Sequence, residues 1–83
     1  MKNILGFKAF GTATGDNQSI QLDEITLVAD AETIRSLGVF LINSAYEMEE
    51  NAVEHIHLQD VIDNFSYDDH VDIIPHLPGQ YNS

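Results

Sequence analysis

Two histidines two positions apart are the residues of this sequence best suited to bind a metal ion. His55 and His57 form an H-x-H motif in the stretch VEHIHL, whose alternation is typical of a β-strand. Side chains at this spacing share one face of a strand, so both imidazoles could reach one Zn²⁺. Glu54 lies on the opposite face, and His70 or His76 supplies a third ligand only if the last strand pairs beside this one. Because H-x-H alone is a weak motif, we expect exposed histidines that contact a partner, and no metal.

Adjacent carboxylates form the second group of candidate residues. Glu49 and Glu50 are one pair, and Asp68 and Asp69 are another. Such pairs can serve in acid–base catalysis where apolar neighbours raise the pKa of one carboxyl group. They can also bind a cation where the residues follow the spacing of a calcium-binding loop. Neither context is present in this sequence. The chain also contains no Cys, no nucleophile-elbow serine and no glycine-rich phosphate loop. We therefore expect a protein without enzymatic activity or cofactors, whose carboxylates form a solvated acidic surface.

Charge is distributed asymmetrically along the chain. The 83 residues include 3 Lys or Arg and 14 Asp or Glu, which gives a formal net charge of −11 at pH 7. Every Lys and Arg lies within the first 35 residues, and residues 36–83 contain none. Binding to nucleic-acid phosphates or to anionic lipid is therefore disfavoured. Acidity can serve solubility alone, but an acidic half also steers a basic protein partner towards it.

The elements that must position these residues follow from hydrophobic periodicity and turn chemistry. Asp30 is predicted to be the N-cap of a helix. This helix is expected to run from about Ala31 to Glu49 or Glu50. Strands are expected at residues 2–13, 19–29, 53–58 and 71–74. This ββαββ order predicts an α+β fold, a two-layer sandwich with one long helix on a mostly antiparallel sheet of about four strands. We expect a single domain over residues 1–75 and a flexible C-terminal tail over residues 76–83.

The predicted helix is apolar on more of its circumference than one sheet covers. The first apolar stripe consists of Ile34, Leu37, Leu41, Ala45 and Met48. The second consists of Val39, Ile42 and Tyr46. The first stripe, with Leu41 at its centre, is expected to form the core, and Gly38 beside it allows close approach to a sheet. The second stripe requires another cover, either the C-terminal segment or a second copy of the chain, so a homodimer is among the expected partners.

The order of these features resembles that of small immunity proteins of bacterial polymorphic toxin systems. In that group a strand leads into an acidic helix start, an apolar helix follows, and an H-x-H strand comes next. Here the matching residues are 25–30, Ala31-Glu32, Phe40-Leu41, Ala45, Met48 and His55-x-His57-Leu58 with Asp60. The resemblance spans about residues 20–74. Ala31 stands where the group has proline, a preferred first helical residue, whereas the capping Asp30 is kept.

The resemblance implies a protein that binds and neutralises a cognate toxin in the cell that produces it. We expect an acidic inhibitor that occludes a toxin such as a basic nuclease. The expected partner-binding residues are Glu47, Glu49, Glu50, Glu54, His55, His57, Asp60, Asp63, Asp68 and Asp69.

Two alternative functions fit the same composition. One is a phage or plasmid mimic of nucleic acid that inhibits a host DNA-binding enzyme, and the other is a metal-binding accessory protein that uses His55 and His57. The sequence shows neither a signal-peptide pattern nor a run of about 18 apolar residues. We therefore expect a cytoplasmic protein.

Overall fold

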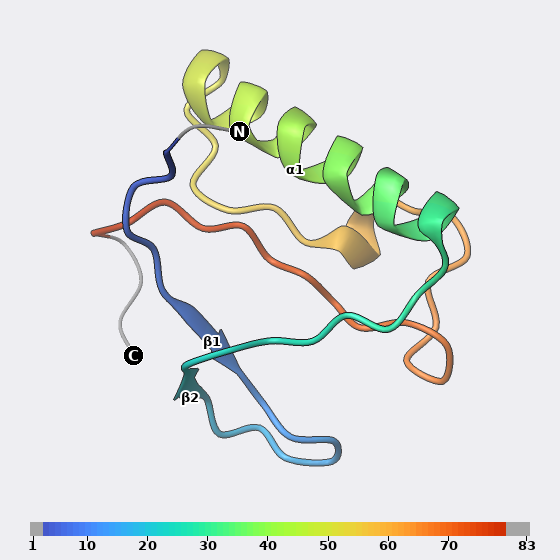
Figure 1. The fold of residues 1–83 in the computed structure, drawn as a ribbon. Coiled ribbons are helices and arrows are strands. Elements are labelled where there is room, and N and C mark those ends of the chain that lie inside the picture. Colours follow the sequence, from blue (N-terminus) through green and yellow to red (C-terminus); the bar gives the residue numbers. More distant parts are fainter. Residues whose placement is uncertain (1–2, 80–83) are drawn as a thin grey trace.

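The computed structural model describes residues 3–79 and has an α+β fold around one long helix (Figure 1). Its elements are β1 (Ala9–Gly11), β2 (Ile20–Leu22), α1 (Ala31–Glu50) and the 3-10 helix η1 (Leu58–Asp60). The predicted helix is confirmed at both ends. In place of about four strands, the described residues form one antiparallel sheet of two, β1 and β2. No helix within residues 3–79 is both long and apolar enough to cross a membrane.

The hairpin of β1 and β2 is shorter than the two strands predicted there. The strands pair antiparallel over three residues each, with Ala9 opposite Leu22. The loop between them turns at Gly15, which has φ 80°, and at Asp16, whose carboxylate accepts a hydrogen bond from the N–H of Asn17. A two-stranded hairpin is only marginally stable alone. Among the described residues no third strand extends this sheet.

The N-terminus of α1 is set by Asp30. The Asp30 carboxylate accepts a 2.8 Å hydrogen bond from the N–H of Thr33, one of the first-turn donors that an α-helix leaves without an internal partner. This bond to the Thr33 backbone, with a further contribution from the Thr33 side chain, lowers the pKa of Asp30 below its ordinary value of 3.8. The capping carboxylate is therefore charged at neutral pH.

Asp30→Ala is expected to lower the melting temperature at neutral pH, because the first turn of α1 loses its cap. A lowered folded-state pKa means that the charged cap stabilises the fold above the ordinary value of 3.8, and that this contribution is lost as the pH falls through the folded-state pKa. In thermal melts, the difference in melting temperature between Asp30→Ala and the wild type should be smaller at strongly acidic pH than at neutral pH. Asp30→Asn keeps a capping oxygen without the charge, so it should retain most of the stability at both pH values.

The C-terminus of α1 turns the chain back beneath the helix. The N–H of Asn51 donates to the Glu47 carbonyl at 2.9 Å, and its side-chain amide donates to the Glu47 carboxylate at 2.8 Å. Ala52 then adopts φ 55°, in the left-handed region that usually favours glycine after a helix. This reversal places residues 53–59 along α1.

The core lies between α1 and the chain that follows it. Phe40 and Leu58 are 7% and 6% exposed, and the buried Ser44 hydroxyl donates to the Phe40 carbonyl at 2.8 Å. The expectation that Leu41 is a central core residue is wrong, because it is 49% exposed. α1 rests on the C-terminal segments and not across a sheet, so its buried face is centred on Phe40 and Ser44. The close approach expected at Gly38 is also missing, since an added Cβ there meets no atom within 4 Å.

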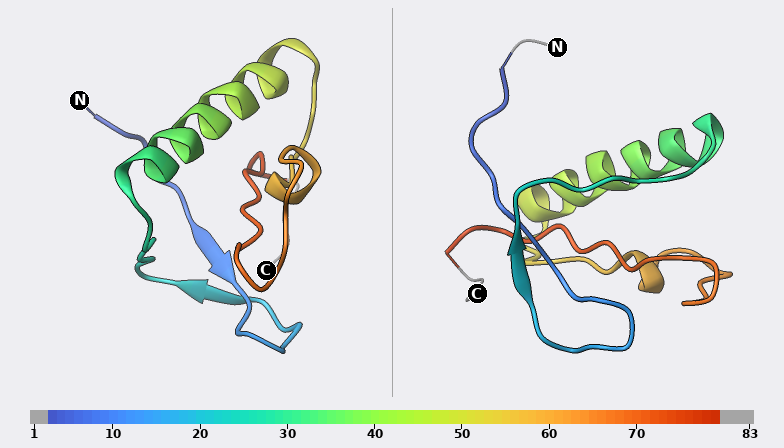
Figure 2. Two further views of the ribbon diagram at one scale, coloured as in Figure 1. Left: turned by 90° about the vertical axis from the view of Figure 1, so that its right-hand side faces the viewer. Right: turned by 60° about the horizontal axis from the view of Figure 1, so that its bottom comes forward.

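Residues 53–59 and 71–77, which include the expected third and fourth strands, lie antiparallel beneath α1 (Figures 1 and 2). The backbone N–H groups of Ile56, Leu58 and Leu77 donate to the carbonyls of Pro75, Ile73 and Glu54. His55 and His76 form an isolated antiparallel bridge between them. The segments thus pair without becoming full strands, in part because Pro75 accepts a hydrogen bond from its opposite residue and has no N–H to return one.

The paired segments also bear on the expected domain boundary at residue 75. His76 bridges His55, and the Leu77 N–H donates to the Glu54 carbonyl, so ordered pairing continues past that boundary. The remainder of the expected tail, residues 80–83, lies outside the described residues.

Candidate functional site

The structure exposes most of the residues predicted to bind a partner. The exposed ones are Glu49, Glu50, Glu54, His55, Asp60, Asp63, Asp68 and Asp69. Glu47 and His57 are partly buried, and each has a partner within the chain. The candidate surface therefore consists of carboxylates spread from the end of α1 to the turn near residue 68, with one histidine among them.

Glu49 and Glu50 occupy an unfavourable position for the helix. They lie in the last turn of α1, where the dipole disfavours negative charge, and that turn contains no basic residue. Within residues 3–79 neither carboxylate forms an ion pair. These charges do not stabilise the fold, and both remain available to a partner.

Asp68 and Asp69 lie on a turn that Ser66 organises. The Ser66 carbonyl accepts hydrogen bonds from the N–H groups of Asp69 at 3.0 Å and His70 at 2.7 Å, and the Ser66 hydroxyl accepts one from the Asp68 N–H at 3.2 Å. The Ser66 N–H donates to His70 Nδ1 at 3.1 Å. This turn fixes the backbone while both aspartate side chains stay exposed.

The two histidines of the H-x-H motif have different environments. His57 Nδ1 lies 2.6 Å from Asp72 Oδ2, a distance at which the ring N–H donates to the carboxylate. Asp72 also accepts a hydrogen bond from the Gln59 N–H at 3.0 Å, and its side chain is only 11% exposed. Asp72 was missing from the predicted site residues. Its role follows from the pairing of the two segments, in which it is a diagonal neighbour of His57.

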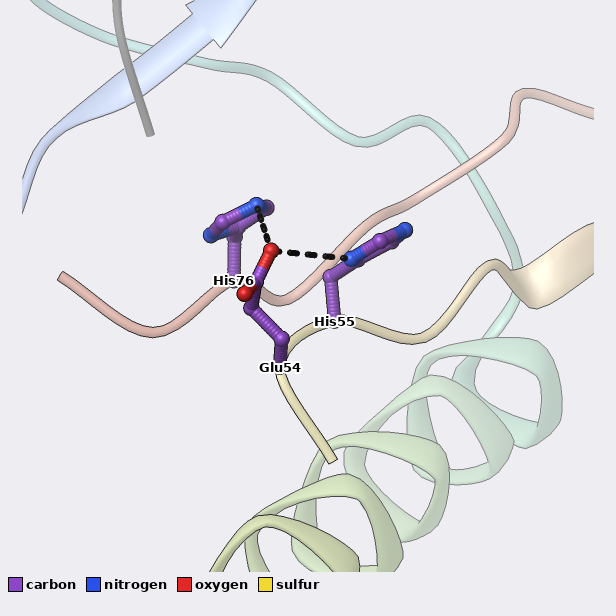
Figure 3. A group of neighbouring side chains, drawn as sticks. All are labelled: Glu54, His55 and His76. Atoms are coloured by element: carbon purple, nitrogen blue, oxygen red, sulfur yellow. Dashed lines mark ion pairs between the residues drawn. The ribbon is translucent and has the colours of Figure 1, made fainter. Parts of the chain in front are cut away.

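His55 forms a second cluster, with Glu54 and His76 (Figure 3). Glu54 Oε1 lies 3.9 Å from His55 Nδ1 and 3.9 Å from His76 Nε2. The two imidazoles are stacked, with ring centroids 5.0 Å apart and planes 6° apart. Glu54 thus reaches the histidines although the alternation of the sequence placed it on the other side of a strand.

Comparison with protein-family models gives a match to an immunity-protein family. The family described as Immunity protein 32 matches residues 24–77, which is more than half of the chain. The chain belongs to this family. No curated protein and no solved structure matches it.

The Immunity protein 32 match confirms the resemblance expected from the sequence. It begins shortly before the capping Asp30 and ends at Leu77, where the hydrogen-bonded pairing of the two C-terminal segments also ends. It therefore includes α1, η1 and every exposed carboxylate of the candidate surface. Membership assigns an immunity function to the chain and implies that a toxin is its partner.

Proposed function

We propose that this Immunity protein 32 family member neutralises its toxin by binding it through the acidic half, residues 36–83, without catalysing a reaction. The observation that carries the proposal is the family match, which contains the helix and both paired segments. The charge of the chain adds the chemistry of the partner. Nine carboxylates and no Lys or Arg in residues 36–83 favour a toxin with a basic surface, such as a nuclease.

The placement of the carboxylates supports a role in binding. Exposed carboxylates on neighbouring elements produce a negative potential that steers a cationic protein and accelerates encounter. Glu49 and Glu50 keep this charge at the negative end of α1. Bound at or beside the active site of a basic nuclease, such a surface keeps nucleic acid away from it.

The test uses the cognate toxin domain, to be sought among the products of the genes that neighbour the gene for this chain. Co-expression with this chain should restore growth of cells that produce the toxin domain, and the two purified proteins should form a stable complex. A complex with an unrelated host DNA-binding enzyme, together with no binding to the toxin domain, would contradict the proposal and favour the nucleic-acid mimic.

We further propose that a second copy of the chain covers the uncovered apolar face of α1. This face consists of Ile34, Val39, Leu41, Ile42 and Tyr46, all between 43% and 70% exposed. The accessible surface of the chain is 7358 Å². A compact monomer of 9.3 kDa exposes about 5,000 Å². Two copies therefore expose about 4,700 Å² more surface than two compact monomers would, within the range of roughly 2,000–5,000 Å² that obligate homodimers bury.

The sequence of α1 fits a helix-to-helix contact between two copies. Gly38 lies beside Ile34 and Leu41 with open space around it, so two helices can approach closely there. The exposed carboxylates that follow α1, such as Asp60, Asp68 and Asp69, lie outside this face and remain available for the toxin.

Ile42→Glu is expected to convert the homodimer into a folded monomer, because it places a charge in the apolar face. Sedimentation velocity gives the mass, and far-UV circular dichroism checks the helix. Ser36→Glu, which adds the same charge at an exposed position that is not one of the residues of this face, should leave the dimer intact. A wild-type chain that sediments as a monomer at high concentration would disprove the dimer and leave the toxin as the cover of this face.

A further inference from the structure

A group of metal-ligating side chains lies where the two C-terminal segments meet, and it differs from the H-x-H motif of the sequence. We propose that Glu54, His55 and His76 bind one Zn²⁺ and thereby connect residues 53–59 to residues 71–77. The proposal concerns the free protein and does not depend on toxin binding.

The backbone holds the two histidines opposite each other. His55 and His76 form the bridge between the paired segments, and residues at such positions have Cβ atoms about 4.5–5.5 Å apart. Hydrogen bonds flank the bridge on both sides, from the Ile56 N–H to the Pro75 carbonyl at 3.2 Å and from the Leu77 N–H to the Glu54 carbonyl at 2.9 Å. The ligands therefore come from two segments that backbone hydrogen bonds hold side by side.

The ligand atoms are already close to the spacing of a zinc site. The three atoms lie within 4.8 Å of one another, and Glu54 Oε1 is 3.9 Å from a nitrogen of each histidine. Bonds of about 2.0–2.2 Å in a tetrahedral site separate the ligand atoms by roughly 3.4 Å, so the two glutamate distances must shorten by about 0.5 Å. The stacked rings require one imidazole to turn towards the ion. His55, whose side chain is 43% exposed, has room to rotate about χ2.

His76 is already oriented as a metal ligand. Its Nδ1 lies 2.9 Å from the Leu77 carbonyl oxygen, so Nδ1 carries the proton and donates to that carbonyl. Nε2, on the Glu54 side, then presents its lone pair to an ion. Histidines that bind metals usually donate their second N–H to a carbonyl or carboxylate in this way. The His57 ring packs edge-on against His55, with ring centroids 5.4 Å apart, but its Nδ1 is bonded to Asp72 and it is not among the three grouped ligands.

The donor set selects the kind of ion. Two imidazoles and one carboxylate suit Zn²⁺ and leave a fourth position for water, whereas Ca²⁺ and Mg²⁺ prefer oxygen ligands alone. The net charge of −11 favours any cation. Because the ligands join two segments that few hydrogen bonds connect, ion binding should stabilise the folded chain.

The test is a calorimetric titration. A chelator first removes any metal from the full chain, and ZnCl₂ is then added stepwise. We expect one Zn²⁺ per chain, a melting temperature that rises with Zn²⁺, and affinity more than about tenfold lower for His76→Gln. His57→Gln, which removes the other candidate histidine, should bind Zn²⁺ as the wild type does.

Two results would overturn the site. One is a wild-type chain that binds no Zn²⁺, and the other is loss of binding in His57→Gln with full binding in His76→Gln. If His76→Gln does not fold, Glu54→Gln makes the same comparison at an exposed position. Wild-type affinity in that variant would also disprove the proposed set.

Discussion

Replacing both Glu49 and Glu50 with lysine is expected to slow association with the cognate toxin about tenfold or more at low salt, and to raise the melting temperature of the free chain. Association slows because steering by opposite charges accelerates encounter by about 10–10³. Stability rises because each cation in the last turn of a helix contributes about 0.3–1 kcal/mol. Stopped-flow association at several salt concentrations and thermal melts measure the two effects. Because the variant should bind more slowly while its fold becomes more stable, slower binding could not be attributed to unfolding.

The matched control for this variant reverses two acidic residues in the other half of the chain. Asp23 and Glu24 are exposed, and their replacement by lysine changes the net charge from −11 to −7, as the Glu49 and Glu50 replacements do. Charges further apart than about 8–10 Å are screened at physiological salt, so only charges near the interface should matter there. Equal slowing in both variants would mean that net charge alone attracts the toxin. An unchanged rate in both at low salt would remove electrostatic steering from the proposal.

The long helix was predictable because its signals are local. Asp30 caps the first turn, and apolar residues recur with helical periodicity up to Glu50. Its buried side was not predictable in the same way. Apolar residues surround more than half of the helix, so the position of the core depends on what packs against it. The chain after Ala52 packs on the Phe40 side, and Leu41 is left half-exposed.

The candidate site was predictable in composition but not in its pairings. The sequence identifies the exposed carboxylates and the histidines, and the structure places most of these carboxylates on the surface. The H-x-H spacing indicates that His55 and His57 act together. The register between two segments about 20 residues apart instead joins His57 to Asp72 and His55 to His76. Such register is a nonlocal property, and Pro75 further weakens the strand signal that would have indicated it.

Phe40→Ala is expected to remove most of the stability of the free chain. Truncating a buried phenylalanine costs about 3–5 kcal/mol. The total for a small domain is about 5 kcal/mol. Within residues 3–79 only Phe40 and Leu58 are buried hydrophobic residues, so few other contacts compensate for the cavity. Urea denaturation followed by circular dichroism measures the loss, and Phe40→Leu provides a milder variant if Phe40→Ala does not fold.

Leu41→Ala is the matched control, because it removes a similar apolar side chain from the next position of α1. Leu41 is half-exposed, so in dilute protein its truncation should cost about 1 kcal/mol, well below the cost at Phe40. If a second copy covers this face, the cost of Leu41→Ala should rise with protein concentration, because dimerisation stabilises only the folded chain. The cost of Phe40→Ala should not rise in this way. Equal losses at both positions in dilute protein would mean that the core of the monomer also includes the Leu41 side of α1.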